Sequence, residues 1–242
     1  MQRVSIIIPI YNEAATIEEI IRRVQAVDLG GLEREILVVN DGSTDATAAL
    51  LGRIPGIRPI HHAQNRGKGA AIRTGLQLAT GNLMILQDGD LEYDPQDLTA
   101  LIRPILEGRA DAVMGSRFLL KKLHFFGPNH APFLTHYLGN QMIIWFTNLL
   151  YHRRYTDYEG CYKAFTAEVV RSIPLTSTRF EIDNELICKL FRRGDRVIEV
   201  PIHYHPRSYQ EGKKITWRHG VVVLWTILKW RILPVGRVSE SV

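Results

Sequence analysis

Short apolar runs alternate with segments of helical periodicity through the first 115 residues of this 242-residue chain, and this alternation constrains the fold more than any other feature. After the β-branched run 4–10, apolar residues recur at positions 17, 20, 21, 24 and 27, as they do on one face of a helix. Strands that alternate with helices build a mostly parallel sheet with helices on its faces. We therefore predict an α/β fold with a Rossmann-like, mostly parallel sheet, whose strands lie near residues 4–10, 35–39, 57–61, 83–87 and 112–115.

Composition excludes several other classes of protein. With 45% hydrophobic and 23% charged residues, the chain matches an ordinary globular domain and not a disordered or fibrous one. Two cysteines are too few for a disulfide scaffold or a four-thiolate zinc site, which favours a reducing, cytoplasmic compartment. Residues 1–10 have the pattern of a strand and not of a secretory signal. The apolar stretches 142–146 and 221–228 are far shorter than the roughly 18–20 residues of a membrane span, so we expect a soluble or peripheral protein.

We predict a single domain over residues 1–242, because no internal repeat or low-complexity linker interrupts the chain. The α/β rhythm of residues 1–117 gives way to a different pattern in residues 118–242. This second half contains an aromatic and His-rich stretch, which reads as helical from about Phe133, and a basic loop before a Trp-rich helix near 217–232. One half is therefore expected to carry the sheet that holds a ligand, and the other to add amphipathic helices.

Charge is distributed unevenly between the two parts of the chain. Residues 1–115 carry 11 Lys and Arg against 15 Asp and Glu, whereas residues 116–242 carry 19 against 10. The split suggests an acidic part that handles a metal or nucleotide and a basic part that meets an anionic partner. A charged surface that only keeps the protein soluble is the alternative. No nucleic-acid-binding motif accompanies the positive charge, so nucleic acid is not an expected partner.

Polar residues follow every predicted strand. Open α/β sheets bind ligands beyond the carboxyl ends of their strands, so these residues are expected to converge at one edge. Two common nucleotide-binding motifs are absent: Ile72 stands where a dinucleotide fingerprint needs its third glycine, and the chain has no G-x-x-x-x-G-K-[ST] loop. The polar strand ends are residues 9–13, 40–42, 65–69, 88–90 and 116–117.

Three carboxylates, Asp88, Asp90 and Glu92, follow the fourth predicted strand. On an extended strand end alternate residues share a face, so the three could bind one divalent cation. Such a cation would offset the charge of a diphosphate leaving group. The alternative is a solvated turn. Asp41, at another strand end, either contacts a base or ribose or caps the next helix, a role that Ser43 and its neighbours could also fill.

Five motifs taken together resemble those of inverting family 2 glycosyltransferases of the GT-A fold. They are PIYNE at 9–13, VVNDGSTD at 38–45, NRGKGAAIRTG at 65–75, QDGDLEYDP at 87–95 and GSR at 115–117. Within this family the chain is most similar to the dolichol- and polyprenol-phosphate sugar synthases, such as the dolichol-phosphate mannosyltransferases. The resemblance extends over roughly residues 3–232.

The resemblance implies roles for individual residues. Asp88, Gly89 and Asp90 match the donor-binding D-x-D motif, with metal ligands at Asp90 and Glu92. Arg117 matches an arginine that contacts the donor. A basic pair that grips phosphate corresponds to Arg207 and Lys213, which stand in a loop that could fold over an anion, although a solvated basic loop is the alternative. The positions that hold the nucleotide correspond to Pro9, Tyr11, Glu13, Val39 and Asp41.

The resemblance also implies an activity. It is the transfer of a hexose, mannose or glucose, from a GDP- or UDP-sugar to a polyprenyl phosphate, with Mg²⁺ or Mn²⁺, at the cytoplasmic face of a membrane. Two segments depart from the usual pattern: TDYEGCYK at 156–163 replaces D-x-T-S-G-F, and EGKKI at 211–215 replaces G-E-S-K-L. These departures leave the acceptor open.

The chemistry of the acceptor decides which residues are needed. A phosphate acceptor is already an anion, so positioning and charge stabilisation would carry the rate, with Arg117 as a catalytic group. A hydroxyl acceptor needs a carboxylate to take its proton, for which Asp157 is the first candidate and Glu159 the second. The Trp-rich helix near 217–232 suits either a membrane headgroup region or packing against the sheet.

The sequence also leaves other functions open. One is transfer to a hydroxyl of a glycan or another lipid in cell-envelope synthesis. Another is a non-catalytic module that binds a nucleotide-sugar, against which the intact D-x-D motif argues. A sugar-1-phosphate nucleotidyltransferase is set aside, because no glycine-rich loop follows the first strand. The pair His203 and His205 could chelate a metal, but packing at a strand end is the favoured interpretation.

Overall fold

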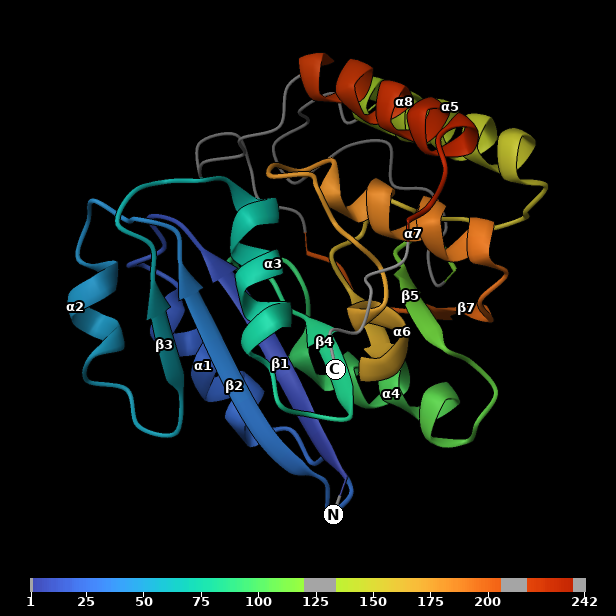
Figure 1. Ribbon diagram of the computed structural model, residues 1–242. Coiled ribbons are helices and arrows are strands. Elements are labelled where there is room, and N and C mark those ends of the chain that lie inside the picture. The colour runs from blue at the N-terminus through green and yellow to red at the C-terminus, as the bar shows by residue number, and fades with distance from the viewer. Residues whose placement is uncertain (1, 120–133, 206–216, 237–242) are drawn as a thin grey trace.

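The computed structural model describes residues 2–119, 134–205 and 217–236. In these residues one mixed sheet has the strand order β3-β2-β1-β4-β6-β5-β7, with helices on both faces (Figure 1). The strands are β1 Arg3–Ile10, β2 Glu33–Asn40, β3 Arg58–His61, β4 Leu83–Leu86, β5 Ala112–Ser116, β6 Lys163–Thr166 and β7 Val197–Pro201. The helices are α1 Ile17–Ala26, α2 Thr47–Leu51, α3 Lys68–Leu78, α4 Leu98–Leu106, α5 Leu134–Tyr151, α6 Ala167–Arg171, α7 Ile182–Arg193 and α8 Trp217–Ile232, with a short 3₁₀ helix η1 at Pro95–Asp97. The predicted α/β fold with a mostly parallel sheet is confirmed.

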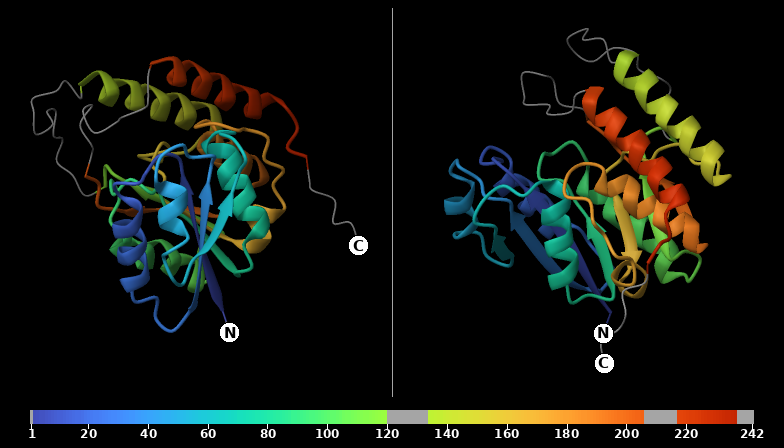
Figure 2. Two further views of the ribbon diagram at one scale, coloured as in Figure 1. Left: turned by 90° about the vertical axis from the view of Figure 1, so that its left-hand side faces the viewer. Right: turned by 45° about the horizontal axis from the view of Figure 1, so that its top comes forward.

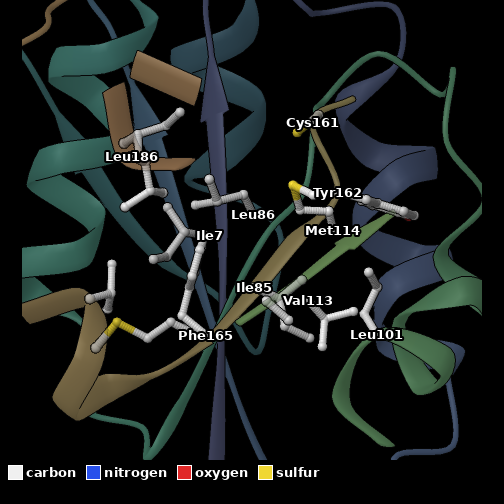
Figure 3. Packing of buried hydrophobic residues seen from close by; sticks show 14 of the residues in the cluster. Ile7, Ile85, Leu86, Leu101, Val113, Met114, Cys161, Tyr162, Phe165 and Leu186 are labelled. Atoms are coloured by element: carbon white, nitrogen blue, oxygen red, sulfur yellow. The ribbon is translucent and has the colours of Figure 1, made fainter. Parts of the chain in front are cut away.

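The first strand is the centre of the sheet because its sequence suits burial on both faces. Residues 4–10 of β1 are all buried, and β1 pairs in parallel with β2 on one side and β4 on the other. Helix α1 covers one face through the apolar residues that its periodicity predicts. Figure 3 shows Ile7 beside Leu186 of α7 on one side of the sheet, and Val113 beside Leu101 of α4 on the other. The core is therefore a helix–sheet–helix sandwich.

Strand β6 is antiparallel, which the strand–helix rhythm of the first half does not predict. It lies between β4 and β5, and its first residue, Lys163, pairs with Leu86 and Met114 at the carboxyl ends of those strands. The segment that precedes β6 therefore lies at the edge where the parallel strands end. Strand β7 ends at the same edge, because Pro201 pairs with Ser116. Two segments far along the chain thus join the polar strand ends of the first half.

Helices α5 and α8 pack side by side beyond α7, at the outer edge of the molecule (Figures 1 and 2). The Tyr151 hydroxyl of α5 donates a hydrogen bond to the Ile227 carbonyl of α8 at 2.9 Å. Each helix has two unlike faces. Val223, Ile227 and Trp230 of α8 are buried, whereas other apolar residues of both helices are exposed. No helix in the described ranges combines the length and apolar character that crossing a bilayer demands.

Candidate active site

The loops that follow β1 and β2 are joined by hydrogen bonds and form one wall of the site. The Asn12 side-chain oxygen accepts a hydrogen bond from the Thr44 backbone N–H at 2.8 Å, and the Asn12 N–H donates to the Ser43 hydroxyl at 2.9 Å. Asn12 has φ +54°, a left-handed conformation that asparagine tolerates better than most residues. Pro9 and Val39 are direct partners across β1 and β2 and both are buried. The predicted nucleotide-contacting residues of these loops are thus brought together, with Tyr11 and Glu13 half-buried at the rim.

Asp41 holds the turn that begins α3. Its buried carboxylate accepts hydrogen bonds from the backbone N–H of Gly67 at 2.7 Å and of Arg66 at 3.0 Å, and it contacts Nδ1 of His62 at 2.6 Å. Gly67 has φ +96°, which favours glycine, and a Cβ there would meet the Thr178 carbonyl at 2.3 Å. The N–H of Thr47, the first residue of α2, donates to Oδ1 of Asp45 at 3.0 Å, so the alternative in which Asp41 caps that helix is wrong. Asp41 therefore contributes to the site chiefly by holding the Gly67 turn in place.

Residues 88–92 form a turn, and the prediction of an extended strand end with alternating faces is wrong. Leu91 has φ +63°, which bends the chain, and Oδ1 of Asp90 accepts a hydrogen bond from the Glu92 N–H at 3.1 Å. Gly89 is packed so closely that a Cβ would lie 2.6 Å from Cγ2 of Ile10. The turn is therefore fixed in place by its contact with β1.

The Asp88 carboxylate is paired with the first residue of α3. Its Oδ1 lies 2.7 Å from Nζ of Lys68. Burial alone would lower the pKa of the Lys68 ammonium, but the neighbouring Asp88 carboxylate outweighs burial and holds that pKa well above its usual value. Lys68 is therefore a permanent positive charge at this edge. The thiol of Cys161 lies nearby with a pKa raised by burial, which makes it an unreactive neighbour.

The carboxylates of this turn are hard oxygen donors that could help to hold a divalent cation. In the described part of the chain, no three His, Cys, Asp or Glu side chains gather into a group that could hold a metal by itself. Mg²⁺ is usually held by only one or two carboxylates together with substrate phosphates. Asp90 and Glu92 supply two carboxylates of that kind, and the third carboxylate of the turn, Asp88, is paired with Lys68.

Arg117 and Asp157 form a buried ion pair beside the turn. Nε of Arg117 lies 2.7 Å from Oδ2 and Nη2 lies 2.8 Å from Oδ1 of Asp157, which also accepts from the N–H of Arg117 and of Glu159. Burial would raise the pKa of Asp157, but Arg117 outweighs it, and the pKa is lowered. Both carboxylate oxygens are therefore occupied, and this geometry suits the positioning of Arg117 better than the predicted role of a base.

Tyr204 is a site residue that sequence reasoning missed. Its ring lies 5.2 Å from Cζ of Arg117, and its hydroxyl donates to Oε2 of Glu92 at 3.1 Å. The N–H of the next residue, His205, donates to the Glu92 carbonyl at 2.8 Å. His203 contacts Asp97 at 2.9 Å through its ring, in line with packing at a strand end. The signal that could have identified Tyr204 is its place soon after β7, a strand that ends at the same edge as the other strands.

Glu159 lies on the same segment and has a different environment from Asp157. Burial raises the pKa of its carboxyl, and a hydrogen bond with the Asn184 side chain offsets that rise only in part. Lys163 and Asp183, joined at 2.9 Å, lie close enough to interact with it. Asp183 belongs to the first turn of α7, an element whose role the sequence did not predict. Arg207 and Lys213, the predicted phosphate grip, lie outside the described residues.

Comparison with known proteins identifies this arrangement. The family model described as Glycosyl transferase family 2 matches residues 5–165. The chain is 29% identical over 87% of its length to a dolichol-phosphate mannosyltransferase of Pyrococcus furiosus, and 25% identical over 86% to a dodecaprenyl-phosphate galacturonate synthase of Rhizobium johnstonii. It spans 59% and 61% of the lengths of these two relatives.

A solved structure agrees with the sequence relatives on the fold. Glucosyl-3-phosphoglycerate synthase from Mycobacterium tuberculosis, crystallised with Mn²⁺, UDP and phosphoglyceric acid, superposes with a TM-score of 0.71 at 21% identity. The match covers 96% of this chain and 80% of that one. It confirms the predicted GT-A fold, and the family model covers well over half of the chain. The chain is a glycosyltransferase and belongs to glycosyl transferase family 2.

Proposed function

We propose that this glycosyltransferase moves a hexose, with inversion, from a GDP- or UDP-sugar to a polyprenyl phosphate at the cytoplasmic face of a membrane. The observation that carries the proposal is the exposed apolar surface of α5 and α8 next to a site with two fixed positive charges. A lipid acceptor with an anionic head needs both features. The names of the two sequence relatives, which act on dolichol phosphate and dodecaprenyl phosphate, support the same acceptor class.

The donor half of the proposal rests on charge at the strand ends. Lys68 and Arg117 are positive groups held by Asp88 and Asp157, so they need no rearrangement to meet a diphosphate. In the proposal Asp90 and Glu92 hold a divalent cation, Mg²⁺ or Mn²⁺, that arrives with the nucleotide. When bound, such a cation offsets the charge that develops on the leaving diphosphate. The nucleoside then lies along the wall formed by the loops after β1 and β2.

The proposed phosphate acceptor is supported first by the lack of any need for a catalytic base. A phosphate is already anionic near neutral pH, so its attack on the sugar requires orientation and charge stabilisation more than a base. Asp157 accepts four hydrogen bonds and is fully buried, so its geometry supports a mechanism in which it orients Arg117. Arg117 is then the group that stabilises negative charge at the reacting end.

Helices α5 and α8 supply the proposed membrane contact, which we call the α5–α8 face. On α5, exposed apolar residues recur at one-turn spacing, and Trp145 has 64% of its surface exposed; on α8, Trp225 has 62% exposed. Lys229 and Arg231 lie at the end of α8. Tryptophan beside basic residues is favourable in the headgroup region of anionic membranes. The exposed apolar residues of the face are Leu138, Met142, Trp145, Leu149, Val221, Val222, Trp225 and Ile232.

The α5–α8 face is connected to the site through one aromatic residue. His219, near the start of α8, packs edge-on against Phe180 with ring centroids 5.4 Å apart. Nζ of Lys68 lies 6.0 Å from the centroid of the same Phe180 ring. A lipid whose chain rests against α8 therefore has a short path for its phosphate to the positive groups of the site.

A second candidate function is transfer to a hydroxyl acceptor, and Glu159 is the observation that favours it. A hydroxyl must lose its proton, and the carboxylate of Glu159, whose pKa is raised by burial, suits that task better than that of Asp157, whose pKa is lowered. In that case Glu159 takes the proton, and Asp157 keeps its role of orienting Arg117.

The test is nucleoside-diphosphate release from a panel of GDP- and UDP-sugars with Mn²⁺ or Mg²⁺, with and without a polyprenyl phosphate in detergent. Release that needs both the lipid and one particular donor supports the synthase and identifies the sugar. Binding of one donor without lipid-dependent release contradicts it. A hydroxyl acceptor is then sought with Glu159→Gln as the diagnostic variant, because only that reaction needs the carboxylate as a base.

A further inference from the structure

A small hollow lies between α3 and the segment that leads into α7, apart from the donor and acceptor residues discussed above. Its volume is about 90 Å³. None of the residues that line it has been assigned a role in the proposed reaction. They are Arg66, Ala70, Arg73, Thr74, Gln77 and Thr178.

The polar groups of the hollow are mostly hydrogen-bond donors. Arg66 and Arg73 each bring a guanidinium, Gln77 brings an amide, and no carboxylate is in the lining. Within the described residues neither guanidinium forms an ion pair, and Nη1 of Arg73 donates a long hydrogen bond to the Thr176 carbonyl at 3.4 Å. The guanidinium of Arg117, by contrast, is bound to both oxygens of Asp157. Two positive groups without a carboxylate partner, in a concave and donor-rich site, favour an anion with several acceptor oxygens.

The walls of the hollow are rigid. The N–H of Ala70 donates to the Thr178 carbonyl at 3.1 Å, so the two sides are joined. A Cβ on Gly69 would lie 2.7 Å from the carbonyl carbon of Thr178, which shows how closely the backbones approach. The Thr74 hydroxyl is held by Nε2 of His62 at 2.9 Å. Binding therefore orders little besides the two arginine side chains, which lowers its entropic cost.

The volume of the hollow leaves room for a small anion. A water molecule takes about 30 Å³ in the liquid, so the hollow has room for roughly three waters. That is enough for one tetrahedral oxyanion. We propose that the hollow binds a phosphate group between Arg66 and Arg73, as free phosphate or as a small phosphate monoester.

The hollow shares a loop with the donor edge without sharing its ligand groups. Asp41 accepts from the N–H of Arg66 and Gly67, and His62 connects Asp41 to Thr74. A phosphate in the hollow therefore lies against the back of the turn that presents Lys68 to Asp88. Binding there is a second site, and it does not depend on which acceptor the enzyme uses.

The experiment records the arginine Nε–Hε NMR signals of the full chain while inorganic phosphate is added, with saturating nucleoside diphosphate and Mg²⁺ occupying the donor site. The proposal expects saturable shifts of the Arg66 and Arg73 signals, assigned from the variants Arg66→Gln and Arg73→Gln. Glycerol 3-phosphate is titrated in a parallel arm. Tighter binding of the monoester points to a phosphorylated metabolite, and equal or weaker binding to free phosphate.

Matched variants keep the proposal falsifiable. Arg73→Gln should weaken phosphate binding about tenfold, as expected for the loss of a charge-assisted pair. Gln77→Glu, at an exposed helix position, replaces the amide donor of the hollow with a carboxylate and should abolish the shifts. Arg53→Gln removes an exposed arginine elsewhere and should change nothing. Signals that do not shift in the wild-type protein, or shifts that persist in both Arg73→Gln and Gln77→Glu, overturn the proposal.

Discussion

Arg117 and Asp157 are 40 residues apart in the sequence and form a two-pronged ion pair in which Asp157 is fully buried and the Arg117 side chain is 12% exposed. The contact exists because β6 enters the sheet antiparallel to β4 and β5, which brings the segment before it to the carboxyl ends of those strands. A guanidinium held by two parallel hydrogen bonds cannot rotate freely, so its remaining N–H groups keep a fixed direction. The pair therefore acts as one unit at the edge of the site.

Asp157→Asn should destabilise the fold by about 3 kcal/mol at neutral pH, because it leaves the buried Arg117 charge without its partner. The pKa of Asp157 is lowered in the fold. Its carboxylate therefore adds stability above the unfolded value of about 3.9, and that contribution is lost as the pH falls through the lower folded value. Chemical denaturation of wild type and variant should give a difference that shrinks on acidification.

A double-mutant cycle separates this pair from its surroundings. Arg117→Gln combined with Asp157→Asn should cost clearly less than the two single changes together, since neither charge is then left unpaired. Additive losses would contradict the view that the two residues act as a unit.

Lys68→Gln should move two affinities in opposite directions. Without the ammonium 2.7 Å from Asp88, the turn carries more net negative charge. Mn²⁺ binding without nucleotide should tighten, and nucleoside-diphosphate binding should weaken, each by about fivefold, or ~1 kcal/mol for a partly exposed pair. Electron paramagnetic resonance measures the affinity for Mn²⁺, and calorimetry measures the affinity for the nucleoside diphosphate. Lys68→Arg keeps the charge and serves as the control; parallel changes in both affinities would rule out this electrostatic account.

Gly89→Ala should displace the turn at 88–92. A Cβ at this position would lie 2.6 Å from Cγ2 of Ile10, and relief of such overpacking costs about 1–3 kcal/mol. Donor affinity should fall with stability, because the same turn carries Asp88 and Asp90. The matched control is Gly139→Ala in α5, where nothing lies within 4 Å of a Cβ and alanine should stabilise the helix by about 0.5–1 kcal/mol. If Gly89→Ala kept the stability and donor affinity of the wild type, the turn would have room for a Cβ and the prediction would be wrong.

The pair of changes Trp145→Ser and Trp225→Ser should reduce binding to anionic vesicles by at least about tenfold, because each indole loses its apolar contact with the bilayer. Both residues are mostly exposed, so folding should be little affected. Vesicle co-sedimentation measures the loss, and added salt should weaken the remaining attraction. Leu106→Ser, an exposed apolar residue on α4, is the control. Equal binding by the control and the double variant would exclude the α5–α8 face as the contact.

The strands of the first half were predictable because burial on both faces leaves a plain signal. Residues 4–10 are apolar except for Ser5, and residues 36–39 are apolar throughout. Both segments lie in buried parallel strands with the expected order of helices between them. The four-residue strand β6 gave no comparable signal, and its antiparallel direction depends on its fit between β4 and β5. Tertiary packing, and not local pattern, decides such an insertion.

The site was predictable as a set of strand-end motifs but not as a set of contacts. Spacing placed Asp88, Asp90 and Glu92 together, yet the left-handed conformation at Leu91 turns the segment and removes the expected alternation of faces. The partner of Asp88 is Lys68, from the start of another element, and no pattern in either segment specifies that pair. Which carboxylate is free to act depends on such cross-loop contacts.

Glu159→Gln should show a pH trend opposite to that of Asp157→Asn. Burial raises the pKa of Glu159, so the fold binds its proton more tightly than the unfolded chain does. In the wild type, stability from this group is present below the unfolded value of about 4.3 and is lost as the pH rises through the higher folded value. Glutamine resembles the protonated form at every pH. The variant should therefore gain stability relative to wild type as denaturation is repeated from about pH 4 to about pH 8; a constant difference would mean that Glu159 keeps an ordinary carboxylate.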